Sequence, residues 1–504
     1  MEVKSGLVGK PHQKGPDVGL VPLRRRDVAD GVVVSEFCEL FQVHINLSDP
    51  FKTIHPRRDL GWGPEPAPTE LRRRSHHHTY IYIGGIALEQ PGDWVPDGGY
   101  DMDYTRGPEG ADEAISPFAE RMSRVPRSFI REILKVTEDP KTISFAGGLP
   151  NPRFFPVREV AEAAQKVLRE SGEAALQYST TEGYLPLREL IVERYARKGL
   201  KVDAEEILIT TGSQQGLDLL GKAFLDKGDR VIVEEPTYLA AIQAFGIFEA
   251  EFRSVPLKED GIDPRALAVA LSEGPAKLFY AVPNFQNPTG VSYSEERRRE
   301  VAGAMRGHAT VFVEDDPYGE LRFIGEEAPS MRRYLGGRAV LLGSFSKVIS
   351  PGLRIGWACA RSDIMERMVI AKQASDLHTS ILSQRIAYQY LVDNDVSQQM
   401  ETVRSGYRRQ RDLMVKMIEE SFPAGVEWTR PEGGMFLWVT LPENMSSLEL
   451  FDRAIKNDVA FVPGQAFYAN GGGYNTLRLN FSNSDEERIV EGMGRLPRSI
   501  EEMM

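Results

Sequence analysis

Short apolar segments alternate with amphipathic helical segments along the middle of this chain, and this order restricts the fold more than any other feature. Five segments have strand length and apolar character: EILITTG (206–212), DRVIVEEP (229–236), AKLFYAVPN (276–284), ATVFVEDDP (309–317) and RAVLLGSFS (338–346). Such alternation predicts an α/β domain whose largely parallel sheet is covered by helices on both faces. Ligands of these sheets lie beyond the carboxyl ends of the strands, so we expect functional residues directly after each strand.

Composition excludes several classes of protein. A formal net charge of −12 argues against a general nucleic-acid or membrane-surface binder, which tends to be basic. No apolar run approaches the roughly 18–20 residues of a membrane span, and the N-terminus lacks the apolar region of a secretory signal. The two cysteines, Cys38 and Cys359, cannot build a disulfide framework. We therefore expect a cytoplasmic protein without nucleic-acid or membrane partners.

The first part of the chain differs from the rest in composition and in residue patterning. Six of the eight histidines lie in the first 100 residues, among arginine and proline clusters that follow no helical or strand period. We predict that residues 1–112 form a poorly ordered extension, or sequence translated upstream of the true start, for which Met102 is a candidate. The triplet His76–His78 has no second ligand cluster at metal-site spacing, so we expect no metal site.

The remaining chain divides into three predicted regions. Residues 113–155 are expected to form an N-terminal arm and part of a smaller domain, 156–385 the large domain, and 386–504 the C-terminal small domain. A helical tract covers roughly 361–420, and strand-like segments follow it: GGMFLWVTLP (433–442), VAFVPGQAF (459–467) and NTLRLNFS (475–482). This mixture predicts a smaller α+β domain.

Each strand of the large domain is followed by a polar motif. These motifs are TTGSQQG (210–216), EEPTYLA with Tyr238, NFQNPTG (284–290), VEDDPYGE (313–320) and GSFSKVIS (343–350). Glycine and serine at the start of a helix leave backbone N–H groups free for an anion, but a capped helix start looks the same. The tyrosine, the Asn-Pro turn and the acids likewise have purely structural readings. The lysine is harder to explain, because lysine is almost never fully buried unless it is paired or reactive.

Taken together, the motifs occur in one order: GSQQ, EPTY, NPTG, DDPY, SFSK, PGLRIG and LRL. In that order the chain resembles the class I and II aminotransferases, which are fold-type I pyridoxal-phosphate enzymes, from about Phe118 to the C-terminus. The segments SFAGGLPNPRFFP (144–156) and LQYSTTEGY (176–184) resemble a branch with 2-aminoadipate, aromatic and kynurenine aminotransferases of thermophilic bacteria and archaea. The resemblance implies the fold of this class, an α/β large domain with a mostly parallel sheet and a smaller α+β domain.

The resemblance also implies which residues hold pyridoxal 5′-phosphate. Lys347 is expected to form a Schiff base with the aldehyde, since a lysine near cations in a desolvated site has a lowered pKa and is a nucleophile and a base. The phosphate needs hydroxyls, a guanidinium and helix-start amides, and the matching residues are Ser344, Ser346, Arg354, Gly212, Ser213 and Gln214.

Four residues are expected around the cofactor ring. Asp315 matches the acid that keeps the pyridine nitrogen protonated, so that the ring becomes an electron sink. The family spaces this acid three residues before a tyrosine, here Tyr318, which selects Asp315 over its neighbour Asp316. Tyr318 and Asn287 are expected to hydrogen-bond the 3-oxygen of the ring, and Tyr238 to stack on its face. Lys347, Asp315 and Tyr318 are thus the catalytic residues that the resemblance implies.

The same resemblance implies how substrate binds. Arg478 matches the arginine that grips the α-carboxylate through a bidentate fork, with Asn287 beside it. Gly147 and Gly148 allow close backbone approach to the substrate. Arg131 lies on a helix that folds over the substrate side chain in this branch, but an ordinary exposed helix arginine is an equal alternative. Tyr178 matches a tyrosine that reaches the phosphate of the neighbouring subunit, which implies a homodimer with shared active sites.

The implied activity is a ping-pong transfer of an amino group from an L-amino acid, aromatic or 2-aminoadipate-like, to a 2-oxo acid such as 2-oxoglutarate. The sequence leaves the physiological donor open. One alternative is a transcription regulator with a winged-helix module, but the first 112 residues lack its three amphipathic helices, and GWGPEPAPTE breaks such a pattern. Another is a β-lyase or racemase on the same fold. Arg478 and the branch motifs favour transamination.

Overall fold

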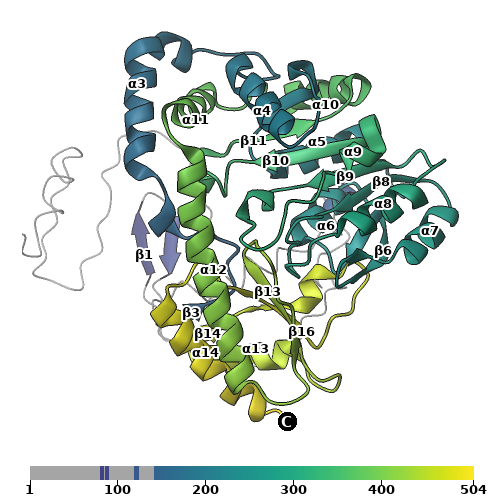
Figure 1. Ribbon diagram of the computed structural model, residues 1–504, viewed down its shortest axis with the longest axis vertical. Coiled ribbons are helices and arrows are strands. Elements are labelled where there is room, and N and C mark those ends of the chain that lie inside the picture. The colour runs from purple at the N-terminus through teal and green to yellow at the C-terminus, as the bar shows by residue number, and fades with distance from the viewer. Residues whose placement is uncertain (1–79, 84–85, 90–117, 124–140) are drawn as a thin grey trace, which may run out of the picture. The chain divides into compact units, whose positions relative to one another are not determined.

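The computed structural model describes residues 80–83, 86–89, 118–123 and 141–504 (Figure 1). The chain divides into two units, Met1–Tyr100 and Asp101–Met504. In the first, β1 (Tyr80–Ile83) pairs antiparallel with β2 (Ile86–Glu89). Apart from these two strands, the predicted 1–112 extension lies outside the described residues, as do Met102 and Arg131, so these predictions remain as stated above.

An eight-stranded sheet forms the centre of the second unit. Its strands, in spatial order, are β4 (Ile207–Thr210), β11 (Gly356–Cys359), β10 (Ala339–Ser344), β9 (Val311–Asp315), β8 (Ala276–Ala281), β5 (Arg230–Glu235), β6 (Glu251–Lys258) and β7 (Gly261–Ile262). Strands β10, β9, β8, β5 and β6 run parallel, whereas β11 is antiparallel to both its neighbours and β7 is antiparallel to β6. The largely parallel sheet predicted from the sequence is confirmed.

The five strands predicted from apolar runs are buried along most of their length. Every residue of β4, β9 and β10 is buried, which explains why these strands read as continuous apolar runs rather than as alternating ones. Strand β6 was not predicted, because its sequence EFRSVPLK alternates exposed and half-buried positions. Strand β11 was missed as well, since GWAC is short and directly follows the PGLR turn.

Helices flank this sheet (Figure 1). α5 contacts β4, β10 and β11, while α7 contacts β6 and α9 contacts β10. The helices of this part are α4 (Leu185–Arg197), α5 (Ser213–Phe224), α6 (Leu239–Gly246), α7 (Pro264–Ser272), α8 (Glu295–Ala304), α9 (Arg332–Leu335), α10 (Ser362–Ser375) and α11 (Ile381–Asp393). Short 3₁₀ helices are η1 (Glu120–Ser123), η2 (Pro152–Phe154), η3 (Ala204–Glu206), η4 (Gly319–Leu321), η5 (Gly336–Arg338), η6 (Pro351–Leu353) and η7 (Gly464–Phe467).

A second, antiparallel sheet is built from the C-terminal part of the chain. Its strands, in spatial order, are β12 (Glu427–Trp428), β13 (Phe436–Thr440), β16 (Thr476–Asn480) and β15 (Val462–Pro463). Nearby, β14 (Val459–Ala460) pairs in parallel with β3 (Ile143–Ser144), so a segment that precedes the large domain in sequence joins the C-terminal strands. The remaining helices are α3 (Val157–Leu176), α12 (Val396–Ser421), α13 (Ser447–Lys456) and α14 (Glu486–Glu501).

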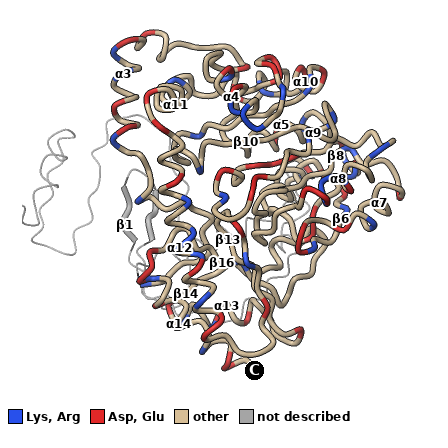
Figure 2. The backbone as a smooth tube through the Cα atoms, viewed as in Figure 1, with Lys and Arg blue, Asp and Glu red and all other residues tan. Residues whose placement is uncertain are grey.

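The long helices α3 and α12 each pack against another helix of the second unit. α3 packs against α11, and α12 packs against α14, as Figure 1 shows. The predicted boundary between residues 385 and 386 falls inside α11, so the division into domains remains a prediction. Lysines, arginines and acids intersperse along the outer helices (Figure 2), as expected of a solvated surface. None of the helices in the described ranges is long and apolar enough to cross a lipid bilayer.

Candidate active site

The lysine of the SFSK motif lies just after the buried strand β10. Its Nζ donates a hydrogen bond to the carbonyl of Gly148 over 3.3 Å. Burial, together with the nearby cations Arg354 and Arg478, lowers the pKa of Lys347 to about 8. A sizeable fraction of this amine is therefore neutral near physiological pH, which is the form that attacks a carbonyl or takes up a proton.

Asp315 ends β9, and its side chain is only 2% exposed. Its Oδ2 accepts a hydrogen bond from the hydroxyl of Tyr280 over 2.8 Å, whereas Oδ1 is buried without a partner in the described structure. Burial raises the pKa of Asp315 to about 7, and the neighbouring Asp316 adds to the shift while the Tyr280 hydrogen bond opposes it. A buried carboxylate oxygen without a donor is costly, so this position suits a ligand that brings a cationic N–H group.

Asp316, the first residue after β9, has a different set of partners. Its Oδ1 accepts hydrogen bonds from the Asn284 side-chain amide and from the backbone N–H of Gly319, each over 2.9 Å. Asp316 thus holds the turn after β9 in shape and has donors of its own. Of the two acids, only Asp315 has a fully buried oxygen without a donor among the described residues.

Arg478 lies in the middle of β16 and is 2% exposed. Its Nη1 donates to Oδ1 of Asn287 over 2.8 Å and its Nη2 to the carbonyl of Ala146 over 2.6 Å. The guanidinium also lies over the rings of Phe436 and Phe467, 4.4 and 5.1 Å from their centroids. Burial lowers the pKa of Arg478 to about 10. Among the described residues no carboxylate forms an ion pair with it, so its charge is free to bind an anion.

Two tyrosines, Tyr318 and Tyr238, and Asn287 lie close to the charged side chains described above. The side-chain amide of Asn287 donates to the hydroxyl of Tyr318 over 3.4 Å, so Asn287 joins Tyr318 to Arg478. Tyr318 packs edge-on against Phe436, with ring centroids 5.8 Å apart. Burial raises the pKa of Tyr318 above its usual range and that of Tyr238, at the start of α6, to about 12. Both hydroxyls therefore stay protonated and can donate to an anionic oxygen.

A cradle for an anion lies at the start of α5. Gly212 precedes the helix with φ of +74°, a conformation that favours glycine. A Cβ atom at this position would lie 2.7 Å from Nη2 of Arg354, so only glycine lets the guanidinium approach. The N–H of Gln215 donates to the Gly212 carbonyl over 3.2 Å, whereas the N–H groups of Ser213 and Gln214 open the helix and have no acceptor four residues back within it.

Two hydroxyls extend this cradle toward the lysine. Oγ of Ser344 donates to Oγ of Ser346 over 2.8 Å, and the backbone N–H of Ser346 donates back to Oγ of Ser344 over 3.0 Å. Ser346 directly precedes Lys347 in sequence, and Ser344 lies three residues before it. A guanidinium, a helix start and two hydroxyls are groups that suit a phosphate, so this cradle is a candidate site for one.

The family model for class I and II aminotransferases matches residues 147–496, more than half of the chain. The chain belongs to this aminotransferase family. The 2-aminoadipate transaminase of Thermus thermophilus is 46% identical over 391 residues, which are 77% of this chain and 97% of that protein. Aromatic-amino-acid aminotransferase 1 of Thermococcus litoralis is 43% identical over 397 residues, 77% of this chain and 94% of that protein.

A solved structure shows the same fold. LysN, an α-aminoadipate aminotransferase from Thermus thermophilus complexed with N-(5′-phosphopyridoxyl)-L-leucine, has a TM-score of 0.72 at 45% identity, covering 77% of this chain and 97% of that one. The predictions of a fold-type I architecture and of a pyridoxal-phosphate-dependent aminotransferase are confirmed.

The residues of this aminotransferase fit its cofactor. The unpartnered Oδ1 of Asp315 suits a protonated ring nitrogen, and the Gly212–Arg354 cradle suits a phosphate dianion. Lys347, with its lowered pKa, suits the aldehyde. These three groups would thus suit the ring nitrogen, the phosphate and the aldehyde of the cofactor.

One described residue of the prediction, Tyr178, does not lie in this cluster. Tyr178 is 80% exposed and lies edge-on to His378, with ring centroids 5.9 Å apart. Arg131 lies outside the described residues. The carbonyl of Gly148 accepts from Lys347, and a Cβ atom at Gly148 would lie 3.4 Å from the Phe436 ring; its role toward substrate stays a prediction.

Sequence reasoning missed Tyr280, Phe436 and Phe467. Tyr280 carried a usable signal, because a tyrosine inside a buried strand needs a partner for its hydroxyl. Its partner, Asp315, lies 35 residues away in sequence and comes close only because β8 and β9 are neighbours. The two phenylalanines carried no signal, since apolar residues in small-domain strands read as ordinary core.

Proposed function

We propose that this aminotransferase transfers the amino group of an L-amino acid, aromatic or 2-aminoadipate-like, to a 2-oxo acid such as 2-oxoglutarate. One observation carries the assignment of the site. Lys347, with its lowered pKa, lies in a cluster that also holds a buried carboxylate oxygen on Asp315 and a buried guanidinium on Arg478, neither of them paired with an opposite charge among the described residues. These groups match a lysine-reactive aldehyde, a ring nitrogen and a substrate carboxylate.

When bound, pyridoxal phosphate supplies an electron sink for the electron pair that remains after the substrate Cα loses its proton. Lys347 would hold the cofactor covalently until the substrate amine replaces it. The Nζ of Lys347 would then take the proton from the substrate Cα and later give it back, a general-base and general-acid role. The carbonyl of Gly148, 3.3 Å from Nζ, orients the lysine.

Three further residues tune and hold the ring. The carboxylate of Asp315 keeps a proton on the ring nitrogen, and Tyr280 fixes that carboxylate in position. The hydroxyl of Tyr318 and the amide of Asn287 would donate to the 3-oxygen of the ring, and Tyr238 would cover one ring face. The phosphate would bind to the residues of the cradle, Gly212, Ser213, Gln214, Ser344, Ser346 and Arg354.

Arg478 would bind the α-carboxylate of the substrate. Its present partners, Asn287 and the Ala146 carbonyl, are neutral acceptors, so they orient the guanidinium without neutralising it. Phe436 and Phe467 exclude water from it, which strengthens its attraction for a carboxylate. The names of the similar proteins, a 2-aminoadipate transaminase and an aromatic-amino-acid aminotransferase, support substrates of these two kinds. Arg131 would then contact the substrate side chain.

We further propose that the enzyme is a cytoplasmic homodimer with shared active sites. An 80% exposed tyrosine such as Tyr178 is unusual on a free surface, and an aromatic residue there is suited to bury itself against a second subunit. Its hydroxyl would reach the phosphate bound by that subunit. Nucleic acid and membrane are not proposed as partners, in view of the net charge of −12.

The rival activities receive less support. Relatives that are 46% and 43% identical are named as aminotransferases, whereas relatives named as HTH-type transcriptional regulators are only 28–29% identical, which favours the enzyme over the regulator. A β-lyase or racemase would use the same lysine, aspartate and cradle, but the orientation of Arg478 and the relatives favour transamination.

Half-reactions test the proposed function. The purified holoenzyme is mixed with each of the twenty amino acids and with L-2-aminoadipate, and the loss of the cofactor's visible absorbance is followed. We expect aromatic amino acids and acidic amino acids of 2-aminoadipate length to react fastest, with recovery of the absorbance on adding 2-oxoglutarate. Release of ammonia or pyruvate without any oxo-acid acceptor would instead identify a lyase.

A further inference from the structure

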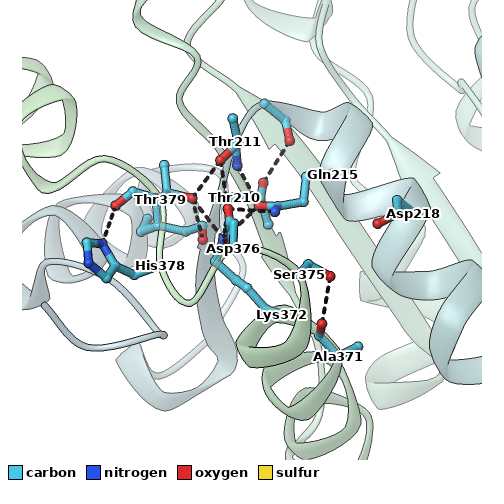
Figure 3. A network of polar contacts seen from close by, with 12 residues as sticks. Thr210, Thr211, Gln215, Asp218, Ala371, Lys372, Ser375, Asp376, His378 and Thr379 are labelled. Atoms are coloured by element: carbon cyan, nitrogen blue, oxygen red, sulfur yellow. Dashed lines mark hydrogen bonds and ion pairs between the residues drawn. The ribbon is translucent and has the colours of Figure 1, made fainter. Parts of the chain in front are cut away.

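A second lysine, unrelated to the chemistry above, is buried behind the anion cradle. Lys372, near the end of α10, has a side chain that is 0% exposed. Its neighbours in Figure 3 come from three parts of the chain: the end of β4, the first turn of α5 and the turn after α10. We call this set the Lys372 network; its members are Thr211, Gln215, Lys372, Asp376 and Thr379.

All three donors of the Lys372 ammonium find acceptors. Nζ donates to Oε1 of Gln215 over 2.7 Å, to the Asp376 carboxylate over 2.9 and 3.0 Å, and to Oγ1 of Thr379 over 3.0 Å. Burial lowers the pKa of Lys372 and Asp376 opposes that shift. Burial also acts to raise the pKa of Asp376, but hydrogen bonds from Lys372 and Gln215 outweigh it and the pKa is lowered. Lys372 and Asp376 therefore form a charged pair, and their hydrogen bonds fix the positions of the ammonium and the carboxylate.

The pair determines how the Gln215 amide lies. Oε1 of Gln215 faces the ammonium of Lys372, and Nε2 donates to Oδ2 of Asp376 over 2.7 Å. Exchanging the two ends of the amide would set Nε2 against an ammonium and Oε1 against a carboxylate. The cation and the anion thus permit one orientation only.

That orientation fixes Thr211, the residue directly before Gly212. The backbone N–H of Thr211 donates to the same Oε1 of Gln215 over 2.8 Å. Its Oγ1 lies 3.2 Å from Oδ2 of Asp376 and 3.1 Å from Oγ1 of Thr379. Its carbonyl accepts from Nη2 of Arg354 over 3.4 Å. The Lys372 network therefore binds the backbone N–H and the hydroxyl of Thr211, while the carbonyl of Thr211 binds Arg354.

We propose that Lys372 and Asp376 are positioning residues for the cofactor phosphate. They orient Gln215, Gln215 fixes the Thr211 backbone, and Thr211 sets both the Gly212 turn and the Arg354 guanidinium. Neither Lys372 nor Asp376 touches the phosphate. The inference rests on the cradle assigned above, and it adds two residues from α10 and its following turn to the determinants of phosphate affinity.

Binding of two cofactor analogues to the full-length apoenzyme tests the proposal. 4′-Deoxypyridoxine 5′-phosphate has no aldehyde, so its dissociation constant reports non-covalent binding, and 4′-deoxypyridoxine lacks the phosphate as well. Lys372→Met should raise the dissociation constant of the phosphate ester by about tenfold or more and leave that of the alcohol unchanged. Titration calorimetry measures both without any catalytic step.

Removing one member of a buried ion pair can unfold a protein, so a second variant is needed. In Lys372→Met/Asp376→Leu both charges are replaced by apolar groups, and we expect wild-type stability with the same tenfold loss for the phosphate ester. Lys222→Met is the matched control, because Lys222 also pairs with an acid four residues away, Asp218, and reaches Ser375 of α10. We expect this variant to bind both analogues as the wild type does.

Three outcomes would overturn the proposal. A double variant that binds the phosphate ester as tightly as the wild type would show that the network positions nothing. Equal losses for ester and alcohol would show a general structural role. Equal affinities of the wild type for ester and alcohol would show that the cradle does not bind phosphate. This failure of the proposed site can be told apart from a failure of the Lys372 network, because it is seen in the wild type without any variant.

Discussion

The hydroxyl of Tyr280 donates to Oδ2 of Asp315 over 2.8 Å and leaves Oδ1 of the same carboxylate buried without a partner in the described part of the chain. The hydrogen bond fixes the carboxylate plane, and the free oxygen marks where a ligand donor belongs. Asp316, one residue on, has both a side-chain and a backbone donor instead. This asymmetry between adjacent acids leads to the first prediction.

Asp315→Asn should lower turnover by on the order of a hundredfold or more, because the amide cannot stabilise a proton on the ring nitrogen, and such preorganised charge contributes a few kcal/mol to the barrier. The cofactor should remain attached to Lys347. Asp316→Asn is the matched control and should have a far milder effect on kcat. A larger loss in Asp316→Asn would show that the strand register of the site is wrong.

Lys347→Ala should lose the covalent link to the cofactor and nearly all turnover. Borohydride reduction followed by peptide mapping checks this, and we expect the label on Lys347 in the wild type. Lys198→Ala, which removes a lysine paired with Glu327, is a suitable control and should keep both label and activity. An alanine variant at 347 that retains activity and a label on another lysine would refute the assignment.

The rate of reconstitution should depend on pH. Only the neutral amine of Lys347 attacks the aldehyde, and its pKa is about 8, so the second-order rate of pyridoxal-phosphate binding to the apoenzyme should rise with pH and level off above that value. Arg478→Met removes one of the two cations that lower this pKa, so the midpoint should move to higher pH. A midpoint that stays near 8 or falls in Arg478→Met would contradict the proposed electrostatic coupling.

Arg478→Lys should reduce kcat/KM for amino acids by on the order of a hundredfold, because lysine has no planar fork for a carboxylate. Arg411→Lys is a control of similar setting, since Arg411 is buried, lies 5.0 Å from the Phe323 ring centroid and donates to the Pro431 carbonyl over 2.8 Å. We expect a loss of stability but normal kcat/KM in that control. Equal losses of kcat/KM in the two variants would argue against carboxylate binding by Arg478.

Removal of residues 1–101 should leave a folded, active and dimeric enzyme. The reason is that the family match begins at residue 147 and the change in composition lies near Met102. Sedimentation, cofactor content and activity measure the three properties. Aggregation or loss of cofactor in the truncated protein would show that the extension contributes to the fold.

The order of strands and of the motifs that follow them could be predicted from the sequence, because both depend on local patterns. Apolar runs bounded by Gly, Pro and Asn indicate buried strands in any context, and parallel strands bring their carboxyl ends to one edge. For this reason the sequence predicts that four residues lie close together at this edge: Lys347, Asp315, Gly212 and Asn287. The choice of Asp315 over Asp316 came from the resemblance to a family and not from strand geometry alone.

Only the tertiary structure determined which residues that are distant in the sequence come into contact. Tyr280 meets Asp315 only because β8 and β9 are neighbours, and Lys372 meets Gln215 only because α10 packs against α5. In the sequence these residues read as a core tyrosine and a solvated helix lysine, since nothing in their own surroundings distinguishes them. Burial gives them their roles, because a buried hydroxyl or ammonium must find partners, and the partners come from segments that only the folded chain brings together.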